Sequence, residues 1–159
     1  MTTSAASPST AIAGCSGRAG RYQYPVAALA AGPSASYVAQ AAVKRILDGD
    51  ETVYIAVQNL VEFWAVATRP LGQNGPGLSV EQATADLRLL EETYDLLPDV
   101  PLHSTWEYLV RTYRVSGKNA HDARLVAAMV VHGVGSILTF DSEFARYPFL
   151  TVLEPRAFA

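Results

Sequence analysis

The sequence predicts an α/β fold, a three-layer α/β/α sandwich with a central parallel sheet. Short apolar runs such as Thr52–Val57 and Ser136–Phe140 have the length of buried strands, and segments with helical spacing of apolar residues separate them. This alternation favours parallel pairing, because a parallel neighbour needs a crossover long enough for a helix. The chain has 159 residues, half of them hydrophobic, which is sufficient for one such core.

The elements are expected in a regular order. We predict a helix from residue 36 to 49, a strand at 52–57, helices at 58–68 and 80–94, a short strand at 95–97, helices at 101–113 and 120–132, a strand at 136–140, a helical turn at 142–145 and a last strand at 150–153. Ser79 is placed to cap the helix that follows it, and Pro70 ends the helix before it.

Residues 1–35 have a different composition from the rest of the chain. They are rich in Ala, Ser, Gly, Pro and Thr and show no period of 2 or 3.6, which is typical of disorder. Two targeting signals are alternatives: Ile12–Cys15 resembles a lipoprotein cleavage box, and the acid-poor opening resembles a transit peptide. Tyr24–Ala30 is the one weak candidate for a strand. We therefore predict a disordered or aberrant segment, 1–35, and a folded domain, 36–159.

Charge and cysteine content exclude several classes of protein. The net charge is −3 and the pI is near 5.5, whereas a general binder of polyanions is usually basic. Any contact with nucleic acid must then come from a local patch, for which Arg69, Lys118, Arg124 and Arg146 are candidates; ordinary solvated charges are the alternative. The single Cys15 excludes an internal disulfide framework and favours the cytoplasm, and no apolar run approaches the roughly 20 residues of a membrane span.

Three carboxylates fall where ligand sites form in parallel sheets. Glu62 lies one turn into the helix after the first clear strand, Asp122 lies in the first turn of the helix at 120–132, and Asp141 directly follows the strand at 136–140. Ligands of such sheets bind beyond the carboxyl ends of the strands. Hard divalent ions such as Mg²⁺ prefer oxygen ligands and bind through a few carboxylates. These residues therefore predict a divalent-metal site.

Structural roles are the alternatives for the same residues. Asn59 and Glu62 have the spacing of an N-cap and its partner three residues on, and Asn119 and Asp122 share it. Asp141 could simply cap the short helix that follows it.

Three segments resemble the PIN-domain family, in particular the ribonuclease toxins of VapBC-type toxin–antitoxin pairs. They are Asn59–Pro70 (NLVEFWAVATRP), Ser116–Met129 (SGKNAHDARLVAAM) and Leu138–Tyr147 (LTFDSEFARY), in the order and spacing of that family. The resemblance implies metal-dependent hydrolysis of RNA with Mg²⁺ or Mn²⁺. It also implies a cognate antitoxin and, commonly, a homodimer, for which the apolar helices at 38–47 and 80–94 are candidate surfaces.

The resemblance assigns roles residue by residue. Glu62, Asp122 and Asp141 stand at the family's carboxylate positions, as metal ligands or activators of water. Thr139 matches a hydroxyl position beside the metal, and Glu143 stands where the family often has a further acid. His121 precedes Asp122 and is a candidate for contact with a phosphate.

One family feature is missing from this chain. PIN domains open with an apolar strand that ends in a metal-binding Asp, but residues 1–47 contain four bases and no carboxylate, while all 15 acids follow. Asp48 and Asp50 precede a strand and so lie at the wrong end of the sheet. A shifted reading frame over codons 1–35 is one hypothesis for this. A catalytically impaired protein that retains antitoxin or RNA binding is therefore the alternative to an active enzyme, and an unrelated α/β domain that binds a small molecule is a third.

Overall fold

The computed structural model describes residues 21–23 and 33–158, which form five strands, five α-helices and three short 3-10 helices. The strands are β1 (Arg21–Gln23), β2 (Thr52–Ile55), β3 (Asp95–Leu96), β4 (Ser136–Leu138) and β5 (Thr151–Leu153). The α-helices are α1 (Pro33–Leu47), α2 (Val57–Ala67), α3 (Val80–Thr93), α4 (His103–Thr112) and α5 (Asn119–His132). The 3-10 helices are η3 (Leu71–Gln73), η4 (Ser142–Arg146) and η5 (Pro155–Phe158).

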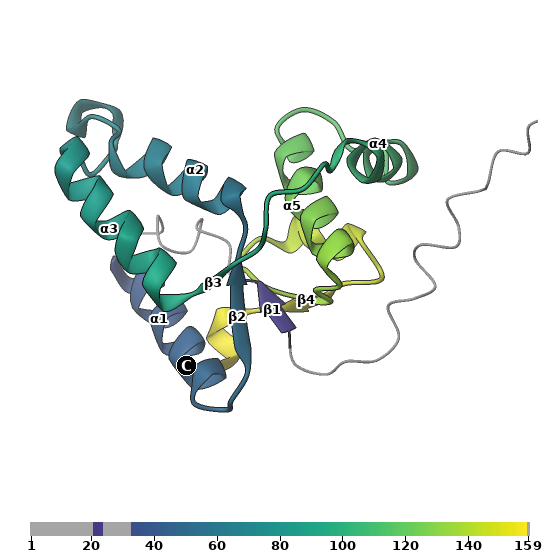
Figure 1. Ribbon diagram of the computed structural model, residues 1–159, viewed down its shortest axis with the longest axis horizontal. Helices are drawn as coiled ribbons and strands as arrows, with labels where there is room; N and C mark the ends of the chain where they lie inside the picture. Colours follow the sequence, from purple (N-terminus) through teal and green to yellow (C-terminus); the bar gives the residue numbers. More distant parts are fainter. Residues whose placement is uncertain (1–20, 24–32, 159) are drawn as a thin grey trace, which may run out of the picture.

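The strands form one sheet in the order β3-β2-β1-β4-β5, and every pairing is parallel. The chain builds the sheet outward from β1 through β2 to β3, and then returns to add β4 and β5 on the other side (Figure 1). The strand order thus reverses at β1, and ligands of open α/β sheets bind at such a point, beyond the carboxyl ends of the strands.

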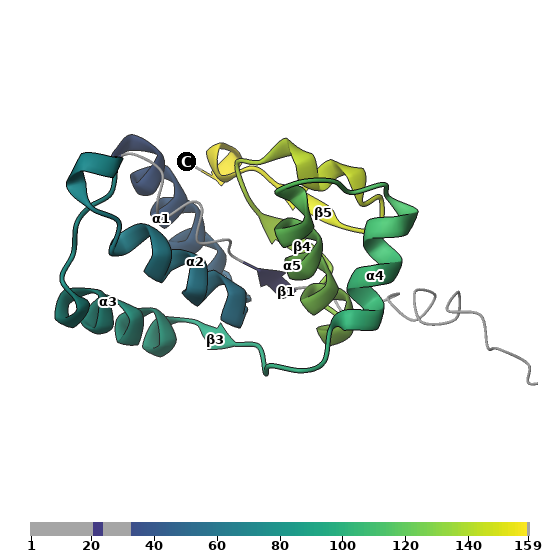
Figure 2. The same cartoon turned by 90° about the horizontal axis from the view of Figure 1, so that it is seen from above.

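Helices cover both faces of the sheet, which confirms the predicted three-layer sandwich. α1, α2 and α3 lie on one side, and α4 and α5 on the other (Figures 1 and 2). Neighbouring residues of a strand point to opposite faces. Accordingly, Ile137 packs in the core cluster with α5, whereas Leu138 packs in the smaller cluster with α1. Each face of β4 is therefore buried by a different helical layer.

The boundaries in residues 36–158 agree with prediction to within a few residues. The capping role predicted for Ser79 is confirmed, since its side chain accepts a hydrogen bond from the Gln82 backbone N–H, and the Gln82 side chain accepts one from the Ser79 backbone N–H. No helix in the described ranges is long and apolar enough to cross a membrane.

The central strand lies in the segment for which we predicted no regular structure. β1 pairs with β2 and β4, and Gln23 is aligned with Tyr54 on one side and Ile137 on the other. Its three residues (RYQ) are too few and too polar to show a strand pattern. The predicted candidate strand Tyr24–Ala30 and the possible targeting signal at Ile12–Cys15 lie outside the described residues.

Candidate active site

The fold brings the three predicted carboxylates to the edge of the sheet where the strand order reverses. Asp141 follows β4, Glu62 lies in α2 just after β2, and Asp122 lies in the first turn of α5. Both α2 and α5 begin at the upper edge of the sheet in Figure 1. The elements that carry these side chains thus converge from both faces of the sheet on one edge.

The electrostatics of Asp122 show that both other carboxylates lie close enough to act on it. The pKa of Asp122 is raised above its ordinary value of 3.8, first by burial and then by the charges of Asp141 and Glu62. Arg146 and His121 act in the opposite direction. Among the described residues none donates a hydrogen bond to the Asp122 side chain, so its negative charge is balanced only at a distance. A cation placed among these groups would offset the repulsion between their charges.

Gln58, which sequence reasoning missed, links the parts of this site. Its Nε2 donates to Glu62 Oε1 at 2.7 Å and to the backbone carbonyl of His121 at 2.8 Å. Its Oε1 accepts a hydrogen bond from Arg124 Nη1 at 3.3 Å. The Gln58 side chain is only 7% exposed, so it joins the start of α2 to the start of α5 from a fixed position. Its spacing of four residues from Glu62 on one helix was the available signal.

Asp141 has the capping role that was the structural alternative for it. Its Oδ1 accepts a hydrogen bond from the Glu143 backbone N–H at 2.8 Å, at the start of η4. The hydroxyl of Thr139, which is buried, accepts from the Asp141 backbone N–H at 3.0 Å and so shapes the turn after β4. Capping engages one carboxylate oxygen, and the exposed side chain leaves Oδ2 for a ligand.

Glu143 is engaged with protein partners. Its carboxylate forms an ion pair with Arg146 and accepts a hydrogen bond from Asn119 Nδ2 at 3.2 Å. Asn119 comes from α5, so this contact fixes η4 against the helix that carries Asp122. Both contacts use Oε2, so Glu143 organises the site through one carboxylate oxygen and keeps Oε1 exposed.

The capping alternatives for Glu62 and Asp122 were wrong. α2 begins at Val57, so Asn59 is not its N-cap; the Asn59 side chain accepts a hydrogen bond from the backbone N–H of Ala56. α5 begins at Asn119 itself, and its N-cap Lys118 makes no side-chain capping bond. Neither Glu62 nor Asp122 is therefore used to close a helix end.

The oxygen donors suit a hard divalent ion only in part. No group of three His, Cys, Asp or Glu side chains in the described ranges is close enough to share one ion. Residues 1–47 contain no carboxylate, so no acid can be added from β1 or the segment after it. Mg²⁺ keeps several waters and binds through one or two carboxylates together with substrate phosphates. The oxygen chemistry present is therefore that of a hydrated ion held weakly by few protein ligands.

The predicted basic rim is divided between two places. Lys118 and Arg124 are exposed at the start of α5, and Arg146 lies close enough to act on Asp122. Arg69 lies two residues beyond the last residue of α2, at the opposite end of that helix from Gln58. Arg146 thus acts directly on Asp122, and Arg124 is linked to Glu62 through Gln58.

Comparison with known proteins shows the family and the fold of the chain. Residues 29–150 match the family model of the PIN domain. A chain of the VapBC-1 structure from nontypeable Haemophilus influenzae superposes with a TM-score of 0.59 at 14% sequence identity, over 85% of this chain and 98% of that one. At this identity the likeness concerns the fold. No curated protein matches the sequence.

Proposed function

Because the chain belongs to the PIN-domain family, we propose that it is a metal-dependent endoribonuclease, the toxin of a toxin–antitoxin pair. The observation that carries the proposal is the position of Asp122 near the point where the strand order reverses, where the charges of Asp141 and Glu62 both act on it. Carboxylates are gathered in this way where a cation and a phosphate are to be bound. The reaction is hydrolysis of an RNA phosphodiester bond.

Asp122 and Asp141 are the proposed ligands of Mg²⁺ or Mn²⁺, and the charge of Glu62 acts on Asp122. The bound ion would supply charge stabilisation at the scissile phosphate and a more acidic water. The chain's own residues orient these groups. Gln58 holds Glu62 by its 2.7 Å hydrogen bond, the turn at Thr139 fixes Asp141, and the Asn119–Glu143 contact fixes η4. His121 and Lys118, exposed beside Asp122, are placed to meet RNA phosphates.

An antitoxin is the proposed protein partner. The structural relative from Haemophilus influenzae is a VapBC complex. Exposed large apolar side chains of this chain are concentrated on α1, α2, α3 and the η3 turn between them: Tyr37, Leu47, Val61, Leu71, Val80 and Leu89. Apolar side chains that gather in this way mark protein–protein interfaces. A homodimer through the same layer and a cytoplasmic location belong to the proposal as well.

The lack of an acid in the first 47 residues favours a second candidate function. The absence of any carboxylate before Asp48 removes the acid that the family resemblance implies at the end of the first strand. Fewer ligands lower the affinity for the ion, and with it the rate. A catalytically impaired protein that still binds antitoxin or RNA is the function that this absence supports.

Cleavage of a fluorogenic RNA by the purified full chain separates the two candidates. We expect cleavage in Mn²⁺ or Mg²⁺, none with a chelator, and none in Asp122→Asn. Asp86→Asn makes the same chemical change at an exposed position of α3 and should cleave like the native chain. Cleavage that persists in chelator and in Asp122→Asn would refute the proposed site. If RNA is bound but not cut at any metal concentration, the second candidate holds.

A further inference from the structure

Arg146 lies in the candidate site, but the hydrolysis proposed above gives it no role. It is the last residue of η4, and its guanidinium is held at two points by a single residue. Nε donates a hydrogen bond to the backbone carbonyl of Glu143 at 3.2 Å, and Nη2 forms an ion pair with the Glu143 carboxylate. Only 26% of the Arg146 side chain is exposed, so packing and hydrogen bonding together fix the guanidinium.

The contacts of Glu143 place this guanidinium between the two elements that carry the proposed ligands. The Glu143 oxygen that pairs with Arg146 also accepts a hydrogen bond from Asn119 Nδ2 at 3.2 Å. Asn119 and Asp122 are three residues apart on α5, so they share one face of that helix. Asp141 caps the start of η4. Arg146 therefore lies beside the first turn of α5, and its charge acts on Asp122.

Part of the guanidinium is left for a ligand. Arginine carries five N–H groups, and the two contacts to Glu143 use two of them. Nη1 of Arg146 donates no hydrogen bond to any residue in the ranges that the structure describes. An arginine that is anchored through one edge of its guanidinium presents the remaining N–H groups in a fixed direction, which suits the oxygens of a phosphate.

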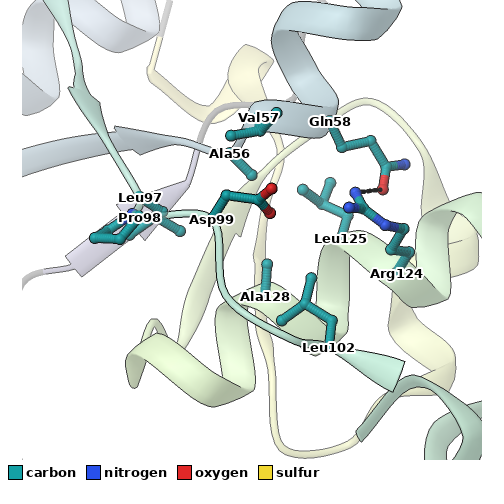
Figure 3. Close-up of a pocket in the computed structure, with 10 residues that line it drawn as sticks. All are labelled: Ala56, Val57, Gln58, Leu97, Pro98, Asp99, Leu102, Arg124, Leu125 and Ala128. Atoms are coloured by element: carbon teal, nitrogen blue, oxygen red, sulfur yellow. Dashed lines mark hydrogen bonds between the residues drawn. The ribbon is translucent and has the colours of Figure 1, made fainter. Parts of the chain in front are cut away.

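The other cations of this region are engaged or less constrained. Figure 3 shows Arg124 turned toward the start of α2, where its Nη1 donates a hydrogen bond to Gln58 Oε1 at 3.3 Å. Lys118 is exposed and makes no side-chain capping bond to α5. The carboxylates of this site repel an RNA phosphate unless positive charge lies beside them. Arg146 is a cation that the fold itself fixes at that place.

Resting on the proposed ribonuclease function, we propose that Arg146 binds the RNA phosphate at this site through Nη1, while Glu143 and Asn119 hold the guanidinium in place. The guanidinium adds positive charge around a phosphate whose negative charge grows as its bond is cut. Phosphate oxygens are the same in every nucleotide, so this contact adds affinity without selecting a base. Glu143 is a positioning residue, because it acts on RNA only through Arg146.

Opposite effects on two ligands distinguish this role from a structural one. A cation next to Asp122 favours the binding of a phosphate and opposes the binding of a metal ion, because like charges repel. Loss of Arg146 should therefore weaken RNA binding and leave the affinity for Mn²⁺ equal or higher. Loss of a residue that only stabilises η4 would displace Asp141 and weaken the binding of both ligands.

The test is Arg146→Gln in the full chain, with fluorescent oligouridine as the probe in a chelator, so that nothing is cut. We expect about tenfold weaker RNA binding, the scale of one hydrogen bond between charged groups. The slope of log affinity against log salt should be smaller by about one. Arg88→Gln, the same change at an exposed position of α3, should leave affinity and slope at their native values. In calorimetry, Arg146→Gln should bind Mn²⁺ at least as tightly as the native chain.

A native chain that binds no oligouridine, or an Arg146→Gln chain that binds it with native affinity, would overturn the proposal. A parallel loss of RNA and Mn²⁺ affinity would overturn it as well. Arg146→Lys keeps the charge opposite Glu143 and replaces Arg146→Gln if that variant does not fold. It should also bind RNA more weakly, because one ammonium group cannot reproduce the guanidinium fork, and native affinity would again contradict the proposal.

The outcome is separable from the test of the enzyme. RNA binding that depends on Arg146 without any cleavage refutes only the enzyme. Cleavage by a chain whose Arg146→Gln variant binds RNA with native affinity refutes only this contact.

Discussion

Replacing Gln58 by alanine tests the link between the two sides of the candidate site. The change removes three hydrogen bonds, to Glu62, to the His121 carbonyl and from Arg124. A neutral bond contributes about 1 kcal/mol net and a bond to a charged group somewhat more, but Arg124 is exposed and can turn to water. Together the three bonds predict a loss of about 3 kcal/mol in the free energy of unfolding. For a chain of this length that corresponds to a fall of about 6–12 °C in Tm.

Urea unfolding in a chelator measures this loss without interference from metal. Gln73→Ala is the matched control, because Gln73 is exposed in η3 and should change stability by less than about 0.5 kcal/mol. In the cleavage assay Gln58→Ala should be impaired under conditions where it is fully folded, since Glu62 is no longer held. A Gln58→Ala chain as stable as the control would show that the three bonds do not join α2 to α5.

Three further outcomes follow from the structure. Because the pKa of Asp122 is raised above 3.8 in the folded chain, the contribution of this group to stability is lost as the pH rises from acid toward neutral. In a chelator, Asp122→Asn should therefore gain stability relative to the native chain over that pH range. A difference in unfolding free energy between the two chains that stays constant with pH would contradict this. Tyr147→Phe should be neutral or stabilising by thermal unfolding, because the buried Tyr147 hydroxyl has no hydrogen-bond partner among the described residues; a loss above about 1 kcal/mol would reveal a partner. Met129→Ala should cost about 2–5 kcal/mol in urea unfolding, since Met129 is fully buried between α5 and the sheet, and a smaller loss would mean that the core closes over the gap.

Most helices and strands could be predicted from the sequence because the patterns that indicate them lie within each element. The helical spacing of apolar residues in α5 and the β-branched residues of β2 both reflect burial against the core. Residues close together in the sequence are enough to show either pattern. β1 could not be predicted, because no pattern within its own residues indicates a strand. Three polar residues become a strand only because β2 and β4 lie on either side of them, and such pairing has no local signal.

The site was predictable to the level of its elements. Positions after strands and near helix starts placed Glu62, Asp122 and Asp141 at one edge, and Asp141 proved to be a cap as well. The contacts between elements could not be read from the chain. The bonds from Gln58 across to α5, and from Asn119 to Glu143, join residues 63 and 24 positions apart, and they depend on how helices pack.

The central claim, that these carboxylates form a divalent-metal site, is tested most directly by calorimetric titration of Mn²⁺ into the full chain. We expect saturable binding that is lost when Glu62, Asp122 and Asp141 are replaced together by Gln, Asn and Asn. A control with Glu91, Asp86 and Asp95 changed in the same way, all exposed on α3 and β3, should bind as the native chain does. Equal binding by the native chain and the site variant would contradict the assignment.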